Sequence, residues 1–158
     1  VATAAKILPV PREGAWMDPG PLGTLGVGMP FALAAQIAHP KKRVVIMYGD
    51  GSFGLNGFEY DTAVRFGLPI IGVMGNDAAW GQMMRPQGAV YGWDRLAATE
   101  LTYTRYDKVV EALGGHGEYC ERPEEIRPAL DRAAASGKPA LVNIKIRQDK
   151  EYKGGIYV

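Results

Sequence analysis

The sequence predicts an α/β fold, a doubly wound and mostly parallel sheet with helices on both faces. Short, continuous apolar runs recur along the chain, and such runs are typical of strands buried on both faces of a parallel sheet. Segments of helical character lie between the runs, and glycine or proline ends each of them. The runs that predict strands are Val44–Tyr48, Ile70–Met74 and Leu141–Ile146.

The remaining elements follow from residues that begin or end secondary structure. Proline in a first turn begins a helix, and glycine or His-Pro after an apolar stretch ends one. Clusters of glycine and proline predict loops or extended backbone. In chain order we expect an extended lead-in over residues 1–20, a helix in the later part of 23–38, a loop over 49–52, a helix over about 55–66, a long loop over 76–93, a short helix over 106–113, a strand over 117–120, a helix over 123–135 and a tail over 147–158.

Length and composition exclude several function classes. A chain of 158 residues predicts a single domain, and 18 basic against 17 acidic residues argue against a nucleic-acid-binding protein. No apolar run approaches the ~20 residues of a membrane span. The single cysteine, Cys120, excludes an intrachain disulfide and favours a cytoplasmic location. Because only two histidines accompany it, a zinc site of the usual type is excluded, and any metal is expected to be a hard cation on oxygen ligands.

Acidic residues follow two of the predicted strands at the point where each strand ends. Asp50 follows the first run and Asp77 follows the second, 27 positions later. Carboxyl ends of neighbouring parallel strands share one edge of a sheet, where open α/β folds bind ligands. Two carboxylates that converge there repel each other unless a cation lies between them, and Mg²⁺ suits such a site. Gly51 would let a diphosphate approach the backbone closely, and Ser52 would add a donor.

Each of these motifs also has a plain structural interpretation. Taken singly, Gly-Asp-Gly is an ordinary turn and Asn-Asp an ordinary helix cap. The two together, at strand ends and at this spacing, favour the cation site. The glycine run Gly23–Gly28, with Asp50 about 22 residues further on, also resembles a dinucleotide-binding fingerprint. That fingerprint requires a strand just before the glycines, and the prolines before Gly23 make a poor strand.

The paired motif resembles that of thiamine-diphosphate-dependent enzymes. Gly49-Asp50-Gly51, followed after 24 residues by Asn76-Asp77, is similar to their Gly-Asp-Gly, a stretch of about this length and Asn-Asn. Nearly the whole chain shares the resemblance. Asp18–Gly28 resembles the segment before this motif in acetolactate synthases and 2-hydroxyacyl-CoA lyases, and Gly75–Gln82 and Lys153–Val158 resemble acetolactate-synthase-like proteins grouped with the lyases.

The resemblance implies a role for individual residues. Asp50 and Asp77 would ligate Mg²⁺ through their carboxylates, and Ala79 through its backbone carbonyl. Asp77 replaces the usual Asn, a form that occurs in the lyase-like subgroup, so we expect the site to be functional. The carbonyl of Gly23 would accept a hydrogen bond from the 4′-amino group of the cofactor, and Leu25 would support the bent cofactor. The expected cofactor-binding residues are Gly23, Thr24, Leu25, Gly49, Asp50, Gly51, Ser52, Asn76, Asp77, Ala79 and Trp80.

The implied activity is cleavage or formation of a carbon–carbon bond next to a carbonyl, with thiamine diphosphate and Mg²⁺ as cofactors. Either 2-hydroxyacyl-CoA lyase or acetolactate synthase chemistry fits, on a 2-hydroxyacyl-CoA or a 2-oxo acid. Enzymes of this kind take a catalytic glutamate from a pyrimidine-binding domain, and nothing in residues 1–158 matches that domain. We therefore assign no catalytic residue in this chain, expect it to be inactive alone, and expect a homodimer or tetramer of the complete enzyme.

Three points stay open at this stage. Arg85 is a candidate partner for an anionic substrate group or an ordinary surface residue. The chain is a fragment of a longer polypeptide or the smaller subunit of a split enzyme. A nicotinamide-binding Rossmann oxidoreductase module and a non-catalytic, cofactor-binding regulatory subunit are the alternative functions.

Overall fold

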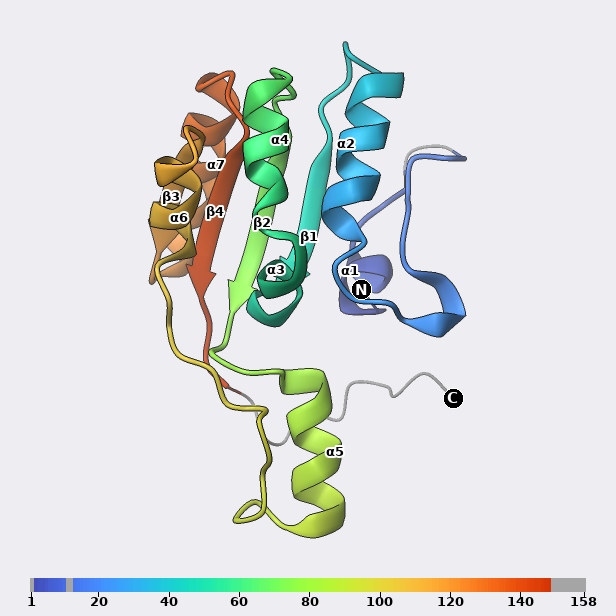
Figure 1. Cartoon of the computed structure of the whole chain (residues 1–158), viewed down its shortest axis with the longest axis vertical. Coiled ribbons are helices and arrows are strands. Elements are labelled where there is room, and N and C mark those ends of the chain that lie inside the picture. The colour runs from blue at the N-terminus through green and yellow to red at the C-terminus, as the bar shows by residue number, and fades with distance from the viewer. Residues whose placement is uncertain (1, 11–12, 149–158) are drawn as a thin grey trace.

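A parallel sheet of four strands organises the part of the chain that the computed structural model describes, residues 2–10 and 13–148. The strand order is β1-β2-β4-β3, and every neighbouring pair is parallel (Figure 1). The strands are β1 (Val45–Gly49), β2 (Ile71–Asn76), β3 (His116–Cys120) and β4 (Ala140–Lys145).

Helices cover both faces of this sheet, which confirms the predicted fold class. Three helices lie on one face and one lies on the other (Figure 1). The first face carries α2 (Gly28–Ala38), α4 (Glu59–Arg65) and α6 (Tyr106–Ala112), and the second carries α7 (Pro123–Ala135). The other helical segments are α1 (Ala2–Ile7), η1 (Gly20–Leu22), α3 (Asp50–Asn56) and α5 (Gly81–Tyr91). Among residues 2–10 and 13–148, none of the helices has the length and apolar character of a membrane span.

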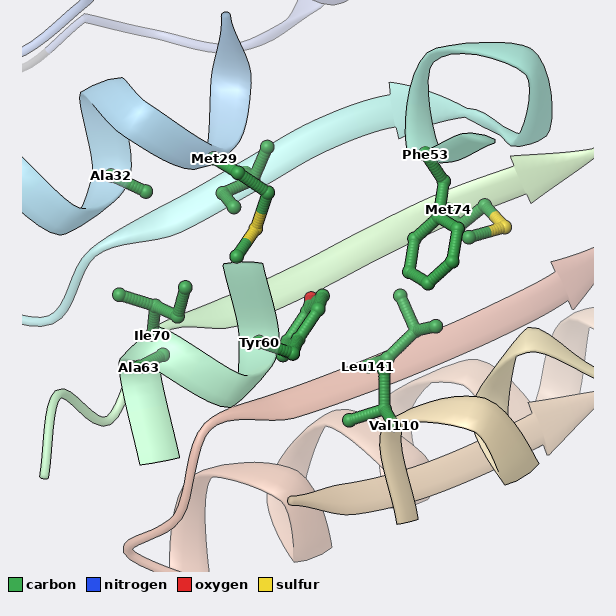
Figure 2. Close-up of a cluster of buried hydrophobic side chains, with 10 residues drawn as sticks. Met29, Ala32, Phe53, Tyr60, Ala63, Ile70, Met74, Val110 and Leu141 are labelled. Carbon is green, nitrogen blue, oxygen red and sulfur yellow. The ribbon is translucent and has the colours of Figure 1, made fainter. Parts of the chain in front are cut away.

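The larger hydrophobic core lies between the sheet and the first group of helices. Figure 2 shows Phe53 of this core beside Met74, and the ring centroids of Phe53 and Tyr60 are 6.0 Å apart. The hydroxyl of Tyr60 is fully buried, and it lies 2.9 Å from the hydroxyl of Tyr48 and donates to the carbonyl of Ala140 at 3.2 Å. These bonds tie α4 across the sheet to β4. Because a buried hydroxyl needs a partner, they also fix how the helix sits on the strands.

The structure corrects two of the expected segments. The lead-in over residues 1–20 is not extended throughout, since it contains α1. Strand β1 is not buried on both faces, because it lies at the edge of the sheet and α7 covers only the other strands on that side. Val45 and Met47 are consequently 52% and 48% exposed. An apolar run predicts a strand, but it does not show which neighbours cover it.

Three of the expected loops and helices also differ. Asp50 does not lie in a loop, because it is the first residue of α3. The single helix expected over residues 55–66 is divided into α3 and α4 near Gly57, where the ring of Phe53 occupies the space of a Cβ. The expected loop over 76–93 contains α5, which extends beyond the carboxyl ends of the strands (Figure 1). Residues 149–158 of the expected tail lie outside the described residues.

Candidate cofactor and metal site

Asp50 and Asp77 meet at the carboxyl edge of the sheet. Asp50 follows β1 directly and Asp77 follows β2, and these strands are neighbours with Gly49 opposite Gly75. The Asp50 side chain is 1% exposed, whereas Asp77 is half-buried. No well-aligned hydrogen bond reaches either carboxylate oxygen of Asp50 within the described residues, although the amides of Gly51 and Ala79 and the carboxyl of Asp77 lie close enough to act on its pKa. A buried charge without such a bond is unfavourable, so this group requires either a proton or a cation.

The pKa values of the two carboxyl groups also indicate that a cation is needed. Burial raises the pKa of Asp50, and the negative charge of Asp77 raises it further, to about 6. Burial also raises the pKa of Asp77, although the neighbouring Asp50 carboxyl and the positive charge of Arg85 oppose the rise. A divalent cation between the two side chains would remove the repulsion and give the Asp50 oxygens a partner.

The two carboxylates alone do not complete a metal shell. The described residues contain no group of three or more His, Cys, Asp or Glu side chains that could hold a metal ion. A cation here would therefore complete its coordination with backbone carbonyl, phosphate or water oxygens. This is the donor set that Mg²⁺ takes at phosphate-binding sites, so the residues present fit that ion.

The turn after Asp77 is fixed by hydrogen bonds on both sides. The side-chain oxygen of Asn76 accepts from the amide of Ala78 at 3.2 Å, and Ala78 has a φ of 55°, in the left-handed region. The carbonyl of Ala78 accepts from the amide of Leu101 at 2.8 Å, and the amide of Trp80 donates to the carbonyl of Thr99 at 2.8 Å. Ala79, whose carbonyl was expected to ligate the metal, is buried between these anchors.

Glycine allows close packing at two positions beside the carboxylates. A Cβ at Gly51 would lie 2.7 Å from Cε3 of Trp80, so the indole ring of Trp80 rests against the backbone of Gly51. A Cβ at Gly81 would lie 2.7 Å from Oδ2 of Asp77. The structure therefore brings Trp80 into the site next to the Gly-Asp-Gly motif, although the two are far apart in sequence.

The glycine-rich segment before α2 is fastened to α3. The hydroxyl of Ser52 accepts a hydrogen bond from the amide of Gly26 at 3.2 Å, and the side-chain amide of Asn56 donates to the Gly26 carbonyl at 2.9 Å. One lone pair of Ser52, expected at the diphosphate, is thus used within the protein, and its O–H proton stays available as a donor. The role of Asn56 could not be predicted from local sequence, because its hydrogen-bond partner Gly26 lies 30 residues earlier.

The other expected cofactor-binding residues lie on this same segment. Gly23 closes η1 in the left-handed conformation, with a φ of 61°. Thr24 and Leu25 are exposed, so their side chains can contact a ligand or another domain. Among the described residues no strand precedes this segment, which contains η1 and a turn. A dinucleotide fingerprint needs such a strand, so the observed order argues against a nicotinamide site.

Arg85 contributes charge to the site from α5. It is partly buried, and its Nη1 atom would lie 3.4 Å from a Cβ at Gly81, a position also close to Asp77. This placement explains why its charge opposes the rise in the pKa of Asp77. Arg85 is therefore not an ordinary surface residue, although a contact to substrate stays a prediction.

Comparisons with known proteins identify the family. The family described as thiamine pyrophosphate enzyme, C-terminal TPP binding domain, matches residues 1–144. A probable acetolactate synthase of Mycobacterium bovis is 50% identical over 141 residues, which cover 89% of this chain and 26% of the relative. The 2-hydroxyacyl-CoA lyase 2 of Caenorhabditis elegans is 43% identical over 164 residues, covering 100% of this chain and 25% of the relative.

A solved structure supports the same fold. The thiamine diphosphate-dependent 4-hydroxybenzoylformate decarboxylase of Rhodococcus jostii RHA1 matches with a TM-score of 0.74 and 23% identity, over 82% of this chain and 24% of that chain. The chain spans about a quarter of the length of these relatives. This chain belongs to the C-terminal, thiamine pyrophosphate-binding domain family of the thiamine pyrophosphate enzymes.

Proposed function

We propose that this chain forms the diphosphate- and Mg²⁺-binding half of an active site that makes or breaks a carbon–carbon bond next to a carbonyl. The observation that carries the proposal is the buried Asp50 carboxylate, whose two oxygens accept no well-aligned hydrogen bond and which faces a second carboxylate. Membership of the family supports the cofactor. The acetolactate synthase and 2-hydroxyacyl-CoA lyase relatives support the reaction class.

The residues would divide the binding of the cofactor between them. Asp50 and Asp77 would ligate Mg²⁺ with Ala79 as the third protein ligand, and the backbone at Gly51 and the hydroxyl of Ser52 would contact the diphosphate. When bound, thiamine diphosphate supplies the group that takes up the electrons of the bond being broken or formed. The protein would hold the cofactor in one place, and the buried turn after Asp77 would fix the ligating groups relative to one another.

The remaining half of the site would come from elsewhere in the complete enzyme. Apolar side chains beside the glycine-rich segment and α3 are exposed to solvent, although side chains of this size are usually covered. Leu22 is 91% exposed and Phe58 is 77% exposed, and Leu55 and Leu25, which lie between them in sequence, are 53% and 44% exposed. We propose that a pyrimidine-binding domain covers this surface in a homodimer or tetramer and supplies the catalytic glutamate. On this proposal the isolated chain is inactive.

Ligand-binding measurements on the complete enzyme test the proposed function. Isothermal titration should show tight binding of thiamine diphosphate with Mg²⁺, loss of binding in Asp50→Ala, and unchanged binding in Cys120→Ser. Normal recovery of holoenzyme from Asp50→Ala would overturn the metal assignment. Stabilisation by NAD(H) in place of thiamine diphosphate would favour the nicotinamide alternative.

The substrate class is tested by product analysis. Release of an aldehyde from a 2-hydroxyacyl-CoA supports the lyase reaction, and formation of acetolactate from pyruvate supports the synthase reaction. Cofactor binding without either product would favour the non-catalytic alternative.

A further inference from the structure

A row of buried polar side chains connects the turn after β2 to helix α6. The side-chain amide of Asn76 donates to the side-chain oxygen of Asn143 at 3.2 Å and to the carbonyl of Thr104 at 3.1 Å. The side-chain amide of Asn143 donates in turn to Oδ1 of Asp107 at 3.1 Å. Asn76 and Asn143 are fully buried and Asp107 is 1% exposed, so these groups cannot turn to water for other partners.

The outer end of this row is an ion pair. Arg105 donates to Asp107 through Nε, at 3.0 and 3.2 Å from its two oxygens, and through Nη2 at 2.7 Å. The guanidinium also lies over the ring of Tyr119, 4.1 Å from its centroid. Burial opposes the charged form of Asp107, but the bonds from Arg105 and Asn143 outweigh it and hold the pKa of Asp107 below its ordinary value. Asp107 is therefore ionised at neutral pH.

Two acceptors determine which way each amide of the row points: the Asp107 carboxylate and the Thr104 carbonyl, which accepts from Asn76 at 3.1 Å and from Asn143 at 3.3 Å. An ionised carboxylate only accepts hydrogen bonds, so Asn143 must present its NH₂ group to Asp107. Its oxygen then faces Asn76, which must present its own NH₂ group to Asn143. The oxygen of Asn76 is left to accept from the amide of Ala78, as observed. A reversal at any link would bring two donors or two acceptors together.

The inner end of the row holds a strained turn. Ala78 has a φ of 55°, a conformation that residues other than glycine adopt at a cost of about 1–2 kcal/mol. Such a conformation persists only where the surroundings fix it. The bond from Ala78 to the oxygen of Asn76 is one such restraint, and Asp77 and Ala79 flank the turn on either side.

We propose that Asp107, Asn143 and Arg105 are positioning residues for the metal site, because they orient the Asn76 amide that holds the turn between Asp77 and Ala79. The inference rests on the proposed function, since it needs a cation at Asp50 and Asp77. None of the three residues has to touch the metal or the cofactor. They act through Asn76, in the way that outer hydrogen-bond partners orient metal ligands.

Mg²⁺ affinity of the complete enzyme, measured by titration at saturating thiamine diphosphate, tests the proposal. Asp107→Asn keeps the shape of the side chain but removes the charged acceptor and leaves the Thr104 carbonyl to orient the row, and we expect the Mg²⁺ dissociation constant to rise by about 10-fold. Arg105→Met, at a half-exposed position, should weaken Mg²⁺ binding in the same direction and by a smaller factor. Arg105→Lys, which restores the charge, should recover part of that loss.

The chain offers a matched control in a second ion pair. Arg132 donates to Glu118 through two nitrogens, at 2.9 and 2.6 Å, and its side chain is 58% exposed against 48% for Arg105. This pair joins α7 to β3 and has no bond to Asn76. Arg132→Met should lower the unfolding temperature about as much as Arg105→Met and change the Mg²⁺ dissociation constant by less than about twofold.

The outcomes separate this inference from the proposed function. Weaker Mg²⁺ binding in Arg105→Met than in Arg132→Met, at similar unfolding temperatures, supports the positioning role. Equal dissociation constants for these two variants would overturn it, provided that Asp50→Asn has lost Mg²⁺ binding. Unchanged Mg²⁺ binding in Asp50→Asn would instead overturn the metal site itself. Should Asp107→Asn not fold, the arginine variants still decide between these results.

Discussion

Asp50→Asn removes a buried negative charge from the end of β1 and hardly changes the shape of the side chain. Burial and the charge of Asp77 raise the pKa of Asp50 from 3.8 to about 6, so the ionised group destabilises the metal-free fold at neutral pH. A difference of about two pKa units corresponds to about 3 kcal/mol. Solvent reaches the half-buried Asp77 and screens part of this repulsion. We therefore expect the substitution to raise the free energy of unfolding by about 2 kcal/mol near neutral pH.

This gain should depend on pH in a defined direction. A carboxyl whose pKa is raised on folding contributes stability that is complete below its unfolded pKa of 3.8 and is lost as the pH rises through about 6. Asparagine does not titrate, so the advantage of the variant is close to zero near pH ~4 and complete above pH ~6.5. The other titrating groups are common to both proteins and largely cancel in the difference.

Saturating Mg²⁺ and thiamine diphosphate should reverse the order of stability. A ligand at about 100 times its dissociation constant stabilises the protein that binds it by about 2.7 kcal/mol. The unsubstituted protein should gain this amount, whereas Asp50→Asn should gain little because it lacks the carboxylate. The variant should thus have the higher free energy of unfolding in EDTA and the lower one once both ligands are added.

Urea unfolding of the complete enzyme, in EDTA and with both ligands, measures these differences. Asp131→Asn is the control, because Asp131 is an exposed carboxylate on α7 and should change the free energy of unfolding by less than about 0.5 kcal/mol at either pH. A metal-free Asp50→Asn protein that is less stable than the unsubstituted one near neutral pH would refute the reasoning. Full stabilisation of the variant by Mg²⁺ would refute it as well.

Three further substitutions separate the parts of the site. Gly51→Ala places a Cβ 2.7 Å from the ring of Trp80, so we expect about 1–3 kcal/mol of destabilisation by urea unfolding and, by titration, loss of tight thiamine diphosphate binding. Ser52→Ala removes the acceptor of the Gly26 amide, which should lower stability by about 1 kcal/mol and speed hydrogen exchange at Gly26. Slow exchange at Gly26 in that variant would show that the bond does not fix the segment. Cys120→Ser places a hydroxyl in the core under α7 and should lower stability by about 1–3 kcal/mol with no change in Mg²⁺ affinity.

The strands and one long helix could be predicted from local sequence. Continuous apolar runs marked β1, β2 and β4 to within one or two residues. Helix α7 begins at Pro123 and ends before Gly137, as a proline in the first turn and a glycine past the end predict. Such signals lie within the element itself, and they do not require knowledge of the rest of the fold.

Helix α5 could not be predicted because its glycines, which are typical of a loop, instead give room to side chains packed against the helix. Gly81, Pro86 and Gly88 are typical of a loop. In the structure Gly88 gives room to the ring of Trp93, since a Cβ there would lie 2.5 Å from Cδ2 of Trp93, and Gly81 gives room to Asp77. These reasons depend on which residues the fold brings together.

The site itself was predictable in part. The ends of β1 and β2 marked Asp50 and Asp77 because a parallel sheet brings neighbouring strand ends to one edge. The structure brings these two carboxylates together, whereas their role as metal ligands stays a prediction. The row from Asn76 to Asp107 had no sequence signal, because Asn143 lies 67 positions from one partner and 36 from the other.

A crystal structure of the complete enzyme with thiamine diphosphate and Mn²⁺ tests the central claim most directly, because the anomalous signal of manganese locates the ion without assumptions. We predict one strong anomalous peak between β1 and β2, about 2.1 Å from a carboxylate oxygen of Asp50, one of Asp77 and the carbonyl of Ala79. A peak away from these residues, with the cofactor bound and the Asp50 oxygens still without a partner, would contradict the account.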